Sequence, residues 1–264
     1  EVNRLMAGKK FPLTLGIKAA AYDLLVLTDA DCVPASANWL KETVACYGPN
    51  HEIVLGYGAY EKERGFLNKV IRFETVFTAL NYFSFALAGL PYMGVGRNLS
   101  YKKELFFNSG GFTDHRTIPS GDDDLFINKV ARKKNTSISI AKNAFTYSSP
   151  KRTWSEWKEQ KTRHVSTAKY YKPIHKFFLG LYPVTQIAVW LLTPVLLAFL
   201  FMWYYVAGLF FLRWITQRVM FTNAMRRLDA KDLISHIELF DLLQVIYYFR
   251  FARAAVVKTK YRWN

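Results

Sequence analysis

Two aspartates separated by one residue follow the apolar run of residues 24–27. We expect Asp29 and Asp31 to lie where a strand of an α/β sheet ends, and open α/β sheets bind ligands at the carboxyl ends of their strands. Carboxylate oxygens are good ligands for Mg²⁺ or Mn²⁺, which in turn hold diphosphates. The pair therefore predicts a site for a metal-bound diphosphate. The alternative is a polar loop that caps the next helix.

Three adjacent carboxylates, Asp122, Asp123 and Asp124, follow Gly121. Like charges at this spacing repel one another, so at least one pKa should rise unless a cation or hydrogen-bond donors compensate. A carboxyl group with a raised pKa suits a general base. The alternative is the acidic start of a helix over residues 126–133, where carboxylates favour the positive end of the helix dipole. The two interpretations are compatible.

A third group lies in the basic and aromatic segment of residues 151–176. If this segment is helical, Gln160, Arg163 and His164 share one face. An arginine can hold phosphate oxygens through two hydrogen bonds, and glutamine and histidine can bond hydroxyl groups. The alternative is a basic helix that binds lipid head groups beside a membrane.

Two glycine-containing turns add further polar side chains. They supply Lys9, Lys10, Gly96, Arg97 and Asn98. Turn chemistry alone could explain both segments. The spacing after Gly94 does not match a dinucleotide-binding fingerprint, so we expect no Rossmann cofactor site.

The elements that must position these residues alternate between helix and strand over residues 1–150. Continuous apolar residues predict a buried parallel strand at 24–27 and a second strand at 53–55, and another strand is expected at 95–101. Helices are expected over 16–21, 36–47 and 67–87, with Ser36 as the N-cap of the second. Alternation of this kind indicates a mixed α/β sheet with flanking helices.

The composition excludes two broad classes of protein. The chain has 264 residues and 51 % hydrophobic residues, too apolar for a disordered protein. It has two cysteines, Cys32 and Cys46, which excludes a small disulfide-stapled domain and fits a reducing compartment. The formal net charge of +16 suits either a nucleic-acid-binding protein or a membrane protein that faces anionic lipid.

The position of the apolar residues favours a membrane protein with no nucleic-acid partner. No charged residue occurs from Phe177 to Leu212. Two spans of about 17 to 20 residues fit this length better than one, since a hydrocarbon core is about 30 Å thick. We expect the break between Pro194 and Tyr205. The alternative is a buried helical core in a soluble protein.

Charged flanks predict how this hairpin is oriented. Basic residues lie on both sides of the apolar run, so both flanks should face the cytoplasm. We therefore expect a catalytic domain at 1–150, a basic interfacial region at 151–176 and a transmembrane hairpin at 177–217. The last segment, 218–264, is expected to be a third span with its polar side chains turned inward, or an interfacial helix.

The order of these motifs resembles the inverting glycosyltransferases of family 2, which have the GT-A type of fold. The motifs are Gly8-Lys9-Lys10, Asp29-Ala30-Asp31, Gly96-Arg97-Asn98, Gly121 to Leu125, Gln160-x-x-Arg163 and then apolar spans. The nearest group is the membrane-anchored bacterial members related to cellulose, chitin and hyaluronan synthases. The resemblance covers nearly the whole chain, although the first strand of the family is absent. We therefore expect the sequence to be an N-terminally truncated piece, with a GT-A-like sheet that is incomplete at its start.

The resemblance implies a role for each motif. Asp31 would bind Mg²⁺ or Mn²⁺ on the donor diphosphate, and Asp29 would contact the metal or the ribose. Asp123 would be the base that deprotonates the acceptor hydroxyl, with Asp122 as the other candidate because the third carboxylate leaves the register open. The remaining candidate substrate-binding residues are Lys9, Lys10, Gly96, Arg97, Asn98, Asp124, Gln160, Arg163 and His164.

One departure from the pattern concerns the expected substrate. His164 stands where the Gln-x-x-Arg-Trp motif of the family has tryptophan. Without this aromatic residue to stack on a sugar, a processive polymer channel is less well supported.

The expected function is metal-dependent inverting transfer of a sugar at the cytoplasmic face of the inner membrane, by a multi-pass protein. The expected partners are a nucleotide-sugar donor, above all a UDP-sugar, a glycan or lipid-linked acceptor, and membrane lipid. The alternative is a catalytically inactive membrane scaffold subunit that keeps the glycosyltransferase fold.

Overall fold

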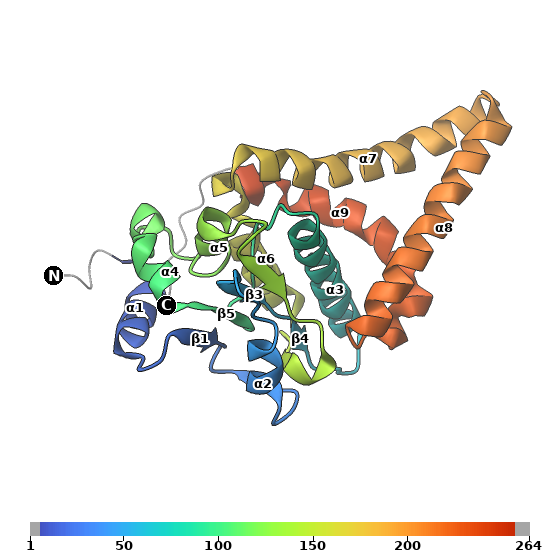
Figure 1. The fold of residues 1–264 in the computed structure, drawn as a ribbon. Coiled ribbons are helices and arrows are strands. Elements are labelled where there is room, and N and C mark those ends of the chain that lie inside the picture. The colour runs from blue at the N-terminus through green and yellow to red at the C-terminus, as the bar shows by residue number, and fades with distance from the viewer. Residues whose placement is uncertain (1–5, 257–264) are drawn as a thin grey trace.

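The computed structural model describes residues 6–256, which form two small β-sheets flanked by helices (Figure 1). The helices before the apolar run are α1 (Lys10–Ala19), α2 (Trp39–Val44), α3 (Phe66–Leu87), α4 (Lys103–Asn108), α5 (Asp124–Val130) and α6 (Trp154–Val165). The apolar run falls within α7 (Pro173–Ala198) and α8 (Trp203–Arg227), and α9 (Ile237–Val256) follows it. This arrangement confirms a mixed α/β fold.

The first sheet has four strands in the order β1-β5-β3-β6. These are β1 (Leu24–Leu27), β5 (Leu99–Lys102), β3 (Ile53–Leu55) and β6 (Thr136–Ile138). β3 is buried at every position and pairs parallel with β6 and antiparallel with β5. The strands at 24–27 and 53–55 were predicted from the sequence with these bounds, while the third begins at Leu99 rather than at 95.

The prediction of a buried parallel strand at 24–27 was wrong in two respects. β1 pairs antiparallel with β5, with Leu24 opposite Lys102, and it lies at the edge of the described sheet. Its residues are only partly buried. A continuous apolar run does not reveal strand direction, because it reports only that both faces of the strand meet other atoms.

The second sheet has three strands in the order β2-β7-β4. β2 (Cys32–Pro34) begins directly after the Asp29-Ala30-Asp31 motif and pairs antiparallel with β7 (Thr146–Ser148). β4 (Gly58–Tyr60) pairs parallel with β7. The pairing in this sheet therefore brings residues 29–31, which lead into β2, and residues 58–60 of β4 to the same side of the molecule.

The long helix α3 joins the sheets to the C-terminal helices. It buries polar and apolar side chains alike, and its aromatic residues pack on rings from other helices. The Phe73 ring stacks on Phe221 of α8 at a centroid distance of 5.4 Å and lies 4.6 Å from the ring of Phe240 of α9. One hydrophobic core thus runs from Ile17 of α1 to Phe240.

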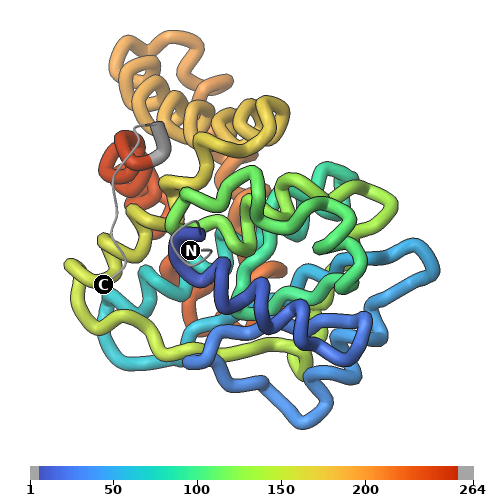
Figure 2. Tube along the Cα trace, turned by 90° about the vertical axis from the view of Figure 1, so that its left-hand side faces the viewer, coloured from blue at the N-terminus to red at the C-terminus, as the bar shows by residue number. Residues whose placement is uncertain are grey.

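The helices α7 and α8 form a hairpin that projects from the rest of the molecule (Figure 1). The break between them, residues 199–202, lies inside the predicted interval from Pro194 to Tyr205. Figure 2 shows from the side that this hairpin lies at one end of the molecule, with α1 and α2 at the other. Ala198 and Trp203 are the residues that bound the turn.

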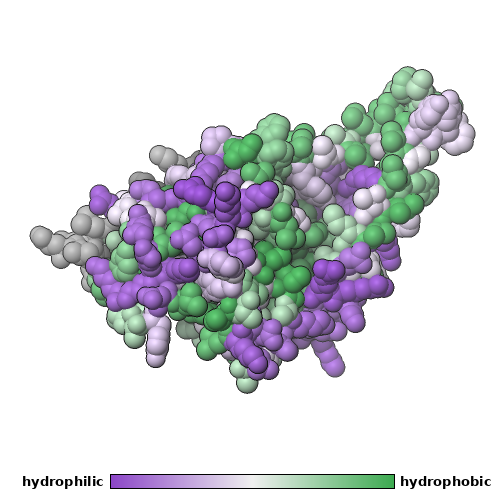
Figure 3. Space-filling view, in the orientation of Figure 1, coloured by the Kyte–Doolittle hydropathy of each residue, from purple (hydrophilic) through white to green (hydrophobic). Residues whose placement is uncertain are grey.

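The surface of the hairpin is largely apolar (Figure 3). Within the described residues, α7 is the one helix whose length and composition would allow it to cross a membrane, and only 6 % of its most apolar window is buried. The helix therefore exposes its apolar side chains, unlike the core helix of a soluble protein. α8 carries Arg213 and Arg218 and does not meet the same criterion.

The expected segment boundaries do not coincide with the ends of helices. The boundary at 176/177 falls inside α7, and the boundary at 217/218 falls inside α8. The end of the last expected segment, 257–264, lies outside the described residues. The described part of that segment contains a short 3₁₀ helix, Lys231–His236, and then α9.

Candidate active site

A cavity of about 790 Å³ lies between the second sheet and helices α3, α6 and α9. Ten of the predicted site residues line it: Lys9, Asp29, Asp31, Gly96, Arg97, Asp123, Asp124, Gln160, Arg163 and His164. Segments that lie more than a hundred residues apart in the sequence thus meet at one place. The three groups of motif residues therefore face a common space.

Asp123 lies at the N-terminus of α5, and two backbone N–H groups hold its carboxylate. The Gly96 N–H donates to Asp123 Oδ2 at 2.7 Å, and the Asp124 N–H donates to Oδ1 at 2.7 Å. Burial raises the pKa of Asp123 to about 8, and the charges of Asp122 and Asp124 act in the same direction. A carboxyl group with this pKa can accept a proton near neutral pH.

The neighbouring carboxyl group, Asp124, makes different contacts. Tyr171 donates its hydroxyl to Asp124 Oδ2 at 2.7 Å, and Thr167 donates to the same oxygen. Burial raises the pKa of Asp124, and these two hydrogen bonds oppose the shift. Because its oxygens are already held by neighbouring residues, Asp124 fixes α5 against the segment that follows α6. Asp122 is partly buried and is not among the residues that line the cavity.

The predicted metal-binding pair faces the cavity. Lys9 Nζ donates to Asp29 Oδ1 at 2.6 Å. Burial by itself would lower the pKa of Lys9, but the hydrogen bond and charge of Asp29 outweigh it and the pKa is raised. Asp31 lines the same space.

The two carboxylates Asp29 and Asp31 are the number of protein ligands expected for a cation that substrate phosphates also bind. Among the residues that the structure describes, no group of three or more His, Cys, Asp or Glu side chains is placed to hold a metal alone. Mg²⁺ in phosphate-transferring sites is bound through one or two carboxylates plus substrate phosphates. Asp29 and Asp31 fit this mode of binding.

Two predicted site residues have structural contacts instead. Lys10 is fully buried, and its ammonium donates to the carbonyl oxygens of Ile118 at 2.6 Å and Ser120 at 2.7 Å. Burial lowers the pKa of Lys10. These bonds hold the loop before the acidic triplet against α1. Lys10 does not line the cavity, so of the two predicted lysines only Lys9 does so.

Asn98 is likewise buried outside the cavity lining. Its side-chain amide donates to the carbonyl oxygens of Tyr57 at 3.0 Å and Ala144 at 2.7 Å, and its Oδ1 accepts from Trp39 Nε1. The amide thereby links helix α2 with the segments around Tyr57 and Ala144. Its polar atoms are thus used to fix the backbone of the preceding residues, Gly96 and Arg97.

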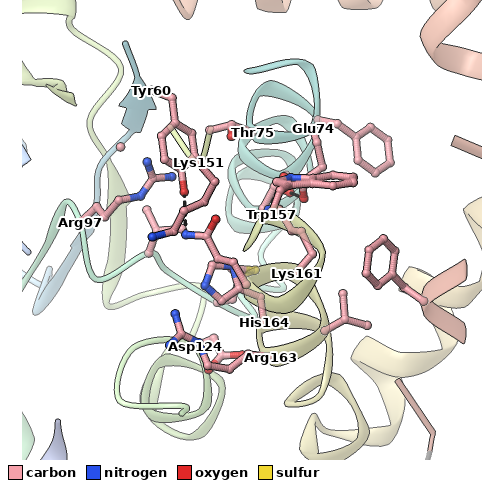
Figure 4. A pocket seen from close by; sticks show the side chains of 18 of the residues that line it. Tyr60, Glu74, Thr75, Arg97, Asp124, Lys151, Trp157, Lys161, Arg163 and His164 are labelled. Carbon is pink, nitrogen blue, oxygen red and sulfur yellow. Dashed lines mark hydrogen bonds and ion pairs between the residues drawn. The ribbon is translucent and has the colours of Figure 1, made fainter. Parts of the chain in front are cut away.

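The Arg97 side chain points toward Tyr60 in the wall of the cavity (Figure 4). Its guanidinium donates to the Ala59 carbonyl and the Ser148 hydroxyl, both at 3.0 Å, and lies 4.1 Å from the centre of the Tyr60 ring. Gln160 of α6 donates to the Tyr60 hydroxyl at 3.1 Å. Tyr60 therefore connects two of the predicted motifs, Gly96-Arg97-Asn98 and Gln160-x-x-Arg163.

His164 lies at the cavity wall next to Arg163 and Asp124 (Figure 4). Its side chain is exposed and lines the cavity. Desolvation by the surrounding protein lowers the pKa of His164 well below its usual range, and the charges of Lys161 and Arg163 act in the same direction. The imidazole is therefore neutral at physiological pH and can donate and accept hydrogen bonds.

Four residues of the site were missed by the sequence analysis. Tyr60, Thr167 and Tyr171 contact the predicted residues directly, and Lys161 of α6 lines the cavity beside them. Tyr171 belongs to the aromatic residues noted in the segment 151–176. No local signal marks Tyr60, because its role depends on the pairing of β4 with β7.

The mixed α/β fold and the joint cavity of carboxylates and basic side chains are consistent with a glycosyltransferase. The family model described as glycosyl transferase family 21 matches residues 6–264, so the chain belongs to that family. The order of the sequence motifs resembles family 2, so the motifs and the family model agree on glycosyl transfer but differ in the family. No curated protein matches the chain significantly. Membership implies a nucleotide-sugar donor and an acceptor in general.

Proposed function

We propose that the protein is a membrane-bound inverting glycosyltransferase that moves a sugar from a nucleotide-sugar donor to a hydroxyl acceptor. The observation that carries this proposal is Asp123, a carboxyl group with a raised pKa held by the Gly96 N–H at the edge of a cavity that also contains Asp29 and Asp31. A base and a diphosphate-binding pair in one space are what a single displacement requires.

In the proposed reaction, Asp123 accepts the proton of the acceptor hydroxyl while that oxygen attacks the anomeric carbon. The bond from this carbon to the diphosphate oxygen breaks, and the nucleoside diphosphate leaves with the electron pair. One displacement inverts the anomeric configuration, so no covalent enzyme intermediate forms. Lys9 and Arg163 stabilise the negative charge that develops on the departing diphosphate.

A divalent cation, Mg²⁺ or Mn²⁺, is part of the proposal. Asp31 and Asp29 would hold it against the diphosphate, and when bound it neutralises charge on the leaving group. A UDP-sugar is the donor that we would test first.

The apolar half of the cavity supports a lipid-linked acceptor over a free glycan. Side chains such as Phe73, Leu179, Leu243 and Phe251 line the cavity beyond the carboxylates. The exposed apolar surface of α7 supports a position in the inner membrane, with the catalytic part in the cytoplasm. The acceptor would then enter from the bilayer with its hydroxyl directed to Asp123.

The first experiment is an assay of nucleoside diphosphate release. Membranes that contain the protein are supplied with a panel of UDP- and GDP-sugars, with Mg²⁺ or Mn²⁺ and a lipid extract as acceptor. The wild type is compared with Asp31→Ala, Asp123→Asn and the control Asp114→Asn. Asp114 is exposed, pairs with Lys129 and does not line the cavity.

We expect release from one donor that needs the cation, Asp31 and Asp123, and that survives Asp114→Asn. Full turnover by Asp123→Asn would contradict the assignment of the base. If the folded protein released no nucleoside diphosphate from any donor in the panel, the result would instead support an inactive scaffold subunit.

A further inference from the structure

Two neighbouring carboxyl groups at the start of α5 receive their hydrogen bonds from different parts of the chain. Asp123 is held by backbone N–H groups, whereas Asp124 is held by two hydroxyl groups from residues after α6. Thr167 and Tyr171 supply these hydroxyls, and both residues are buried, as is Asp124. The proposed reaction assigns no step to either hydroxyl, although both residues line the cavity.

The Asp124 carboxylate accepts hydrogen bonds at both of its oxygens. Oδ1 accepts from the Leu125 N–H at 2.8 Å, and Oδ2 accepts from the Tyr171 hydroxyl at 2.7 Å and from Thr167. The Thr167 hydroxyl also lies 2.8 Å from the carbonyl oxygen of His164, and its hydrogen favours the acceptor that carries a full charge. Donors at both oxygens stabilise the ionised form of Asp124.

Tyr171 is fixed in place by contacts on both sides. The backbone N–H of the next residue, Lys172, donates to Asn128 Oδ1 at 3.1 Å, and Asn128 lies about one turn after Asp124 on α5. The Tyr171 ring meets the Tyr92 ring edge-on at a centroid distance of 5.8 Å. Burial and the charge of Asp124 hold the pKa of Tyr171 well above its usual range, so its hydroxyl remains a donor at physiological pH.

Asp124 acts on Asp123 through one hydrogen bond and through its charge. The Asp124 N–H donates to Asp123 Oδ1 at 2.7 Å, which fixes the distance between the two groups. The negative charge of an ionised Asp124 favours the protonated form of Asp123 and makes Asp123 a stronger base. Adjacent carboxyl groups that compete for a proton titrate as a pair. The two hydroxyls favour the ionised form of Asp124, which leaves the proton to Asp123.

Other charged or titratable groups face this pair of carboxyl groups. They come from the start of α1, the turn before α5, the segment before β5, β5 itself and α6 (Figure 4): Lys9, Lys10, Asp122, Tyr92, Tyr101, Arg163 and His164. The variants described below leave all of these residues unchanged, so a change in the titration of the pair reports the two hydroxyls.

We propose that Thr167 and Tyr171 are positioning residues, which hold Asp124 as a hydrogen-bond acceptor and so leave the transferred proton to Asp123. This proton comes from the acceptor hydroxyl, whose oxygen forms the bond to the anomeric carbon as the bond to the diphosphate oxygen breaks. Thr167 and Tyr171 act through Asp124 and not on the substrate. This inference rests on the proposed function for the identity of the group that gives up the proton.

The test measures the titration of Asp123 without turnover. Infrared spectra of the full chain in lipid nanodiscs are recorded as a function of pH. The carbonyl band of the protonated carboxyl group is assigned to Asp123 in each variant by its loss when Asp123→Asn is added. The pH at which half of this band is lost gives the pKa of Asp123. The pH profile of kcat/KM for nucleoside diphosphate release is measured in parallel.

Four variants separate the hydroxyls from general effects. Tyr171→Phe and Thr167→Val each remove one hydroxyl and keep the shape of the side chain, whereas Thr167→Ser keeps the hydroxyl. Tyr170→Phe is the matched control for the tyrosine, since Tyr170 is exposed and does not line the cavity. Thermal unfolding verifies that each variant folds, and either hydroxyl-deletion variant alone is a sufficient test.

We expect Tyr171→Phe and Thr167→Val to lower the pKa of Asp123 by about one pH unit, because Asp124 then binds a proton more readily and its charge is lost. The pH at which kcat/KM levels off should fall equally, and the plateau should fall about threefold because the base is weaker. Thr167→Ser and Tyr170→Phe should leave both quantities unchanged.

Two results would overturn the proposal: an unchanged pKa of Asp123 in a folded hydroxyl-deletion variant, or an equal change in Tyr170→Phe. A loss of thermal stability without a change in this pKa belongs to the first result and would reduce the two hydroxyls to a structural role. A lowered pKa of Asp123 in a chain that releases no nucleoside diphosphate from any donor would refute the transferase reaction and leave the action of the hydroxyls on Asp123 intact.

Discussion

Asp123 is partly buried and Asp241 is buried, and the two residues differ in what surrounds the carboxylate. Asp123 receives two backbone N–H groups and stands between two other carboxylates. Asp241 of α9 is 3 % exposed and accepts from Gln186 at 2.6 Å, from Trp190 at 2.9 Å, from Arg213 at 3.1 Å and from Gln217.

The difference shows how partners decide what a buried carboxylate can do. Around Asp241 the donors come from α7 and α8, and the arginine supplies a compensating charge, so the group ties three helices together. Around Asp123 the compensation is incomplete, and its pKa is raised to about 8. The first arrangement suits stability, whereas the second suits proton transfer.

The largest expected effect is on catalysis through Asp123. Asp123→Asn keeps the shape of the side chain and removes the base, so kcat should fall by about 10²- to 10⁴-fold while donor binding is retained. Single-turnover kinetics together with equilibrium binding of the donor separate the two quantities. A variant that loses donor affinity but keeps kcat would place Asp123 in the donor site instead.

The next largest expected effect is a loss of stability when the Asp241 carboxylate is removed. Asp241→Ala leaves Arg213 partly buried without its partner, so the free energy of unfolding should fall by about 3–5 kcal/mol. Denaturant titration in detergent measures it. The control is Glu238→Gln on the same helix, whose exposed pair with Arg218 should contribute less than about 1 kcal/mol. If both variants lost the same free energy of unfolding, Asp241 would contribute no more to stability than an exposed ion pair.

The pH dependence of catalysis offers a sharper test of Asp123. A base must be deprotonated in the free enzyme, so kcat/KM should rise about tenfold per pH unit and level off above about 8. The folded state holds this proton at pH values where an unfolded aspartate, with a pKa of about 3.9, has lost it. Stability should therefore fall as pH rises from about 4 to 8, and Asp123→Asn should weaken that dependence.

The smallest expected effect comes from the residue that holds Asp123. A Cβ at position 96 would lie 3.3 Å from Asp123 Oδ2, so Gly96→Ala should shift the carboxylate by a few tenths of an ångström. We expect kcat/KM to fall by about tenfold, measured by steady-state kinetics. Gly16→Ala is the matched control, because a Cβ at Gly16 meets no atom within 4 Å.

The sequence predicted those features that depend on neighbouring residues in the chain. The strand at 24–27, the helix that ends at Leu87 and the turn between the two apolar helices follow from local patterns of apolar and turn residues. The Asp29 and Asp123 motifs were located by residue type and spacing. These features require no knowledge of what packs against them.

The features that escaped prediction depend on contacts between distant residues. Lys10 and its neighbour Lys9 look equivalent in sequence, yet Lys10 is fully buried against the loop that ends at Ser120. The direction of β1 is fixed by its pairing with β5, about 75 residues away. The meeting of Gln160 with Tyr60 likewise depends on the packing of α6 beside β4.

The helix α9 contacts two parts of the molecule. Phe240 and Gln244 line the cavity, and Asp241, the residue after Phe240, accepts hydrogen bonds from the hairpin. Hydrogen bonds attach α9 to α7 and α8 along one side. A change in the tilt of the hairpin would therefore move the part of the cavity wall that α9 forms. The width of the apolar half of the cavity therefore depends on how the hairpin is held by its surroundings.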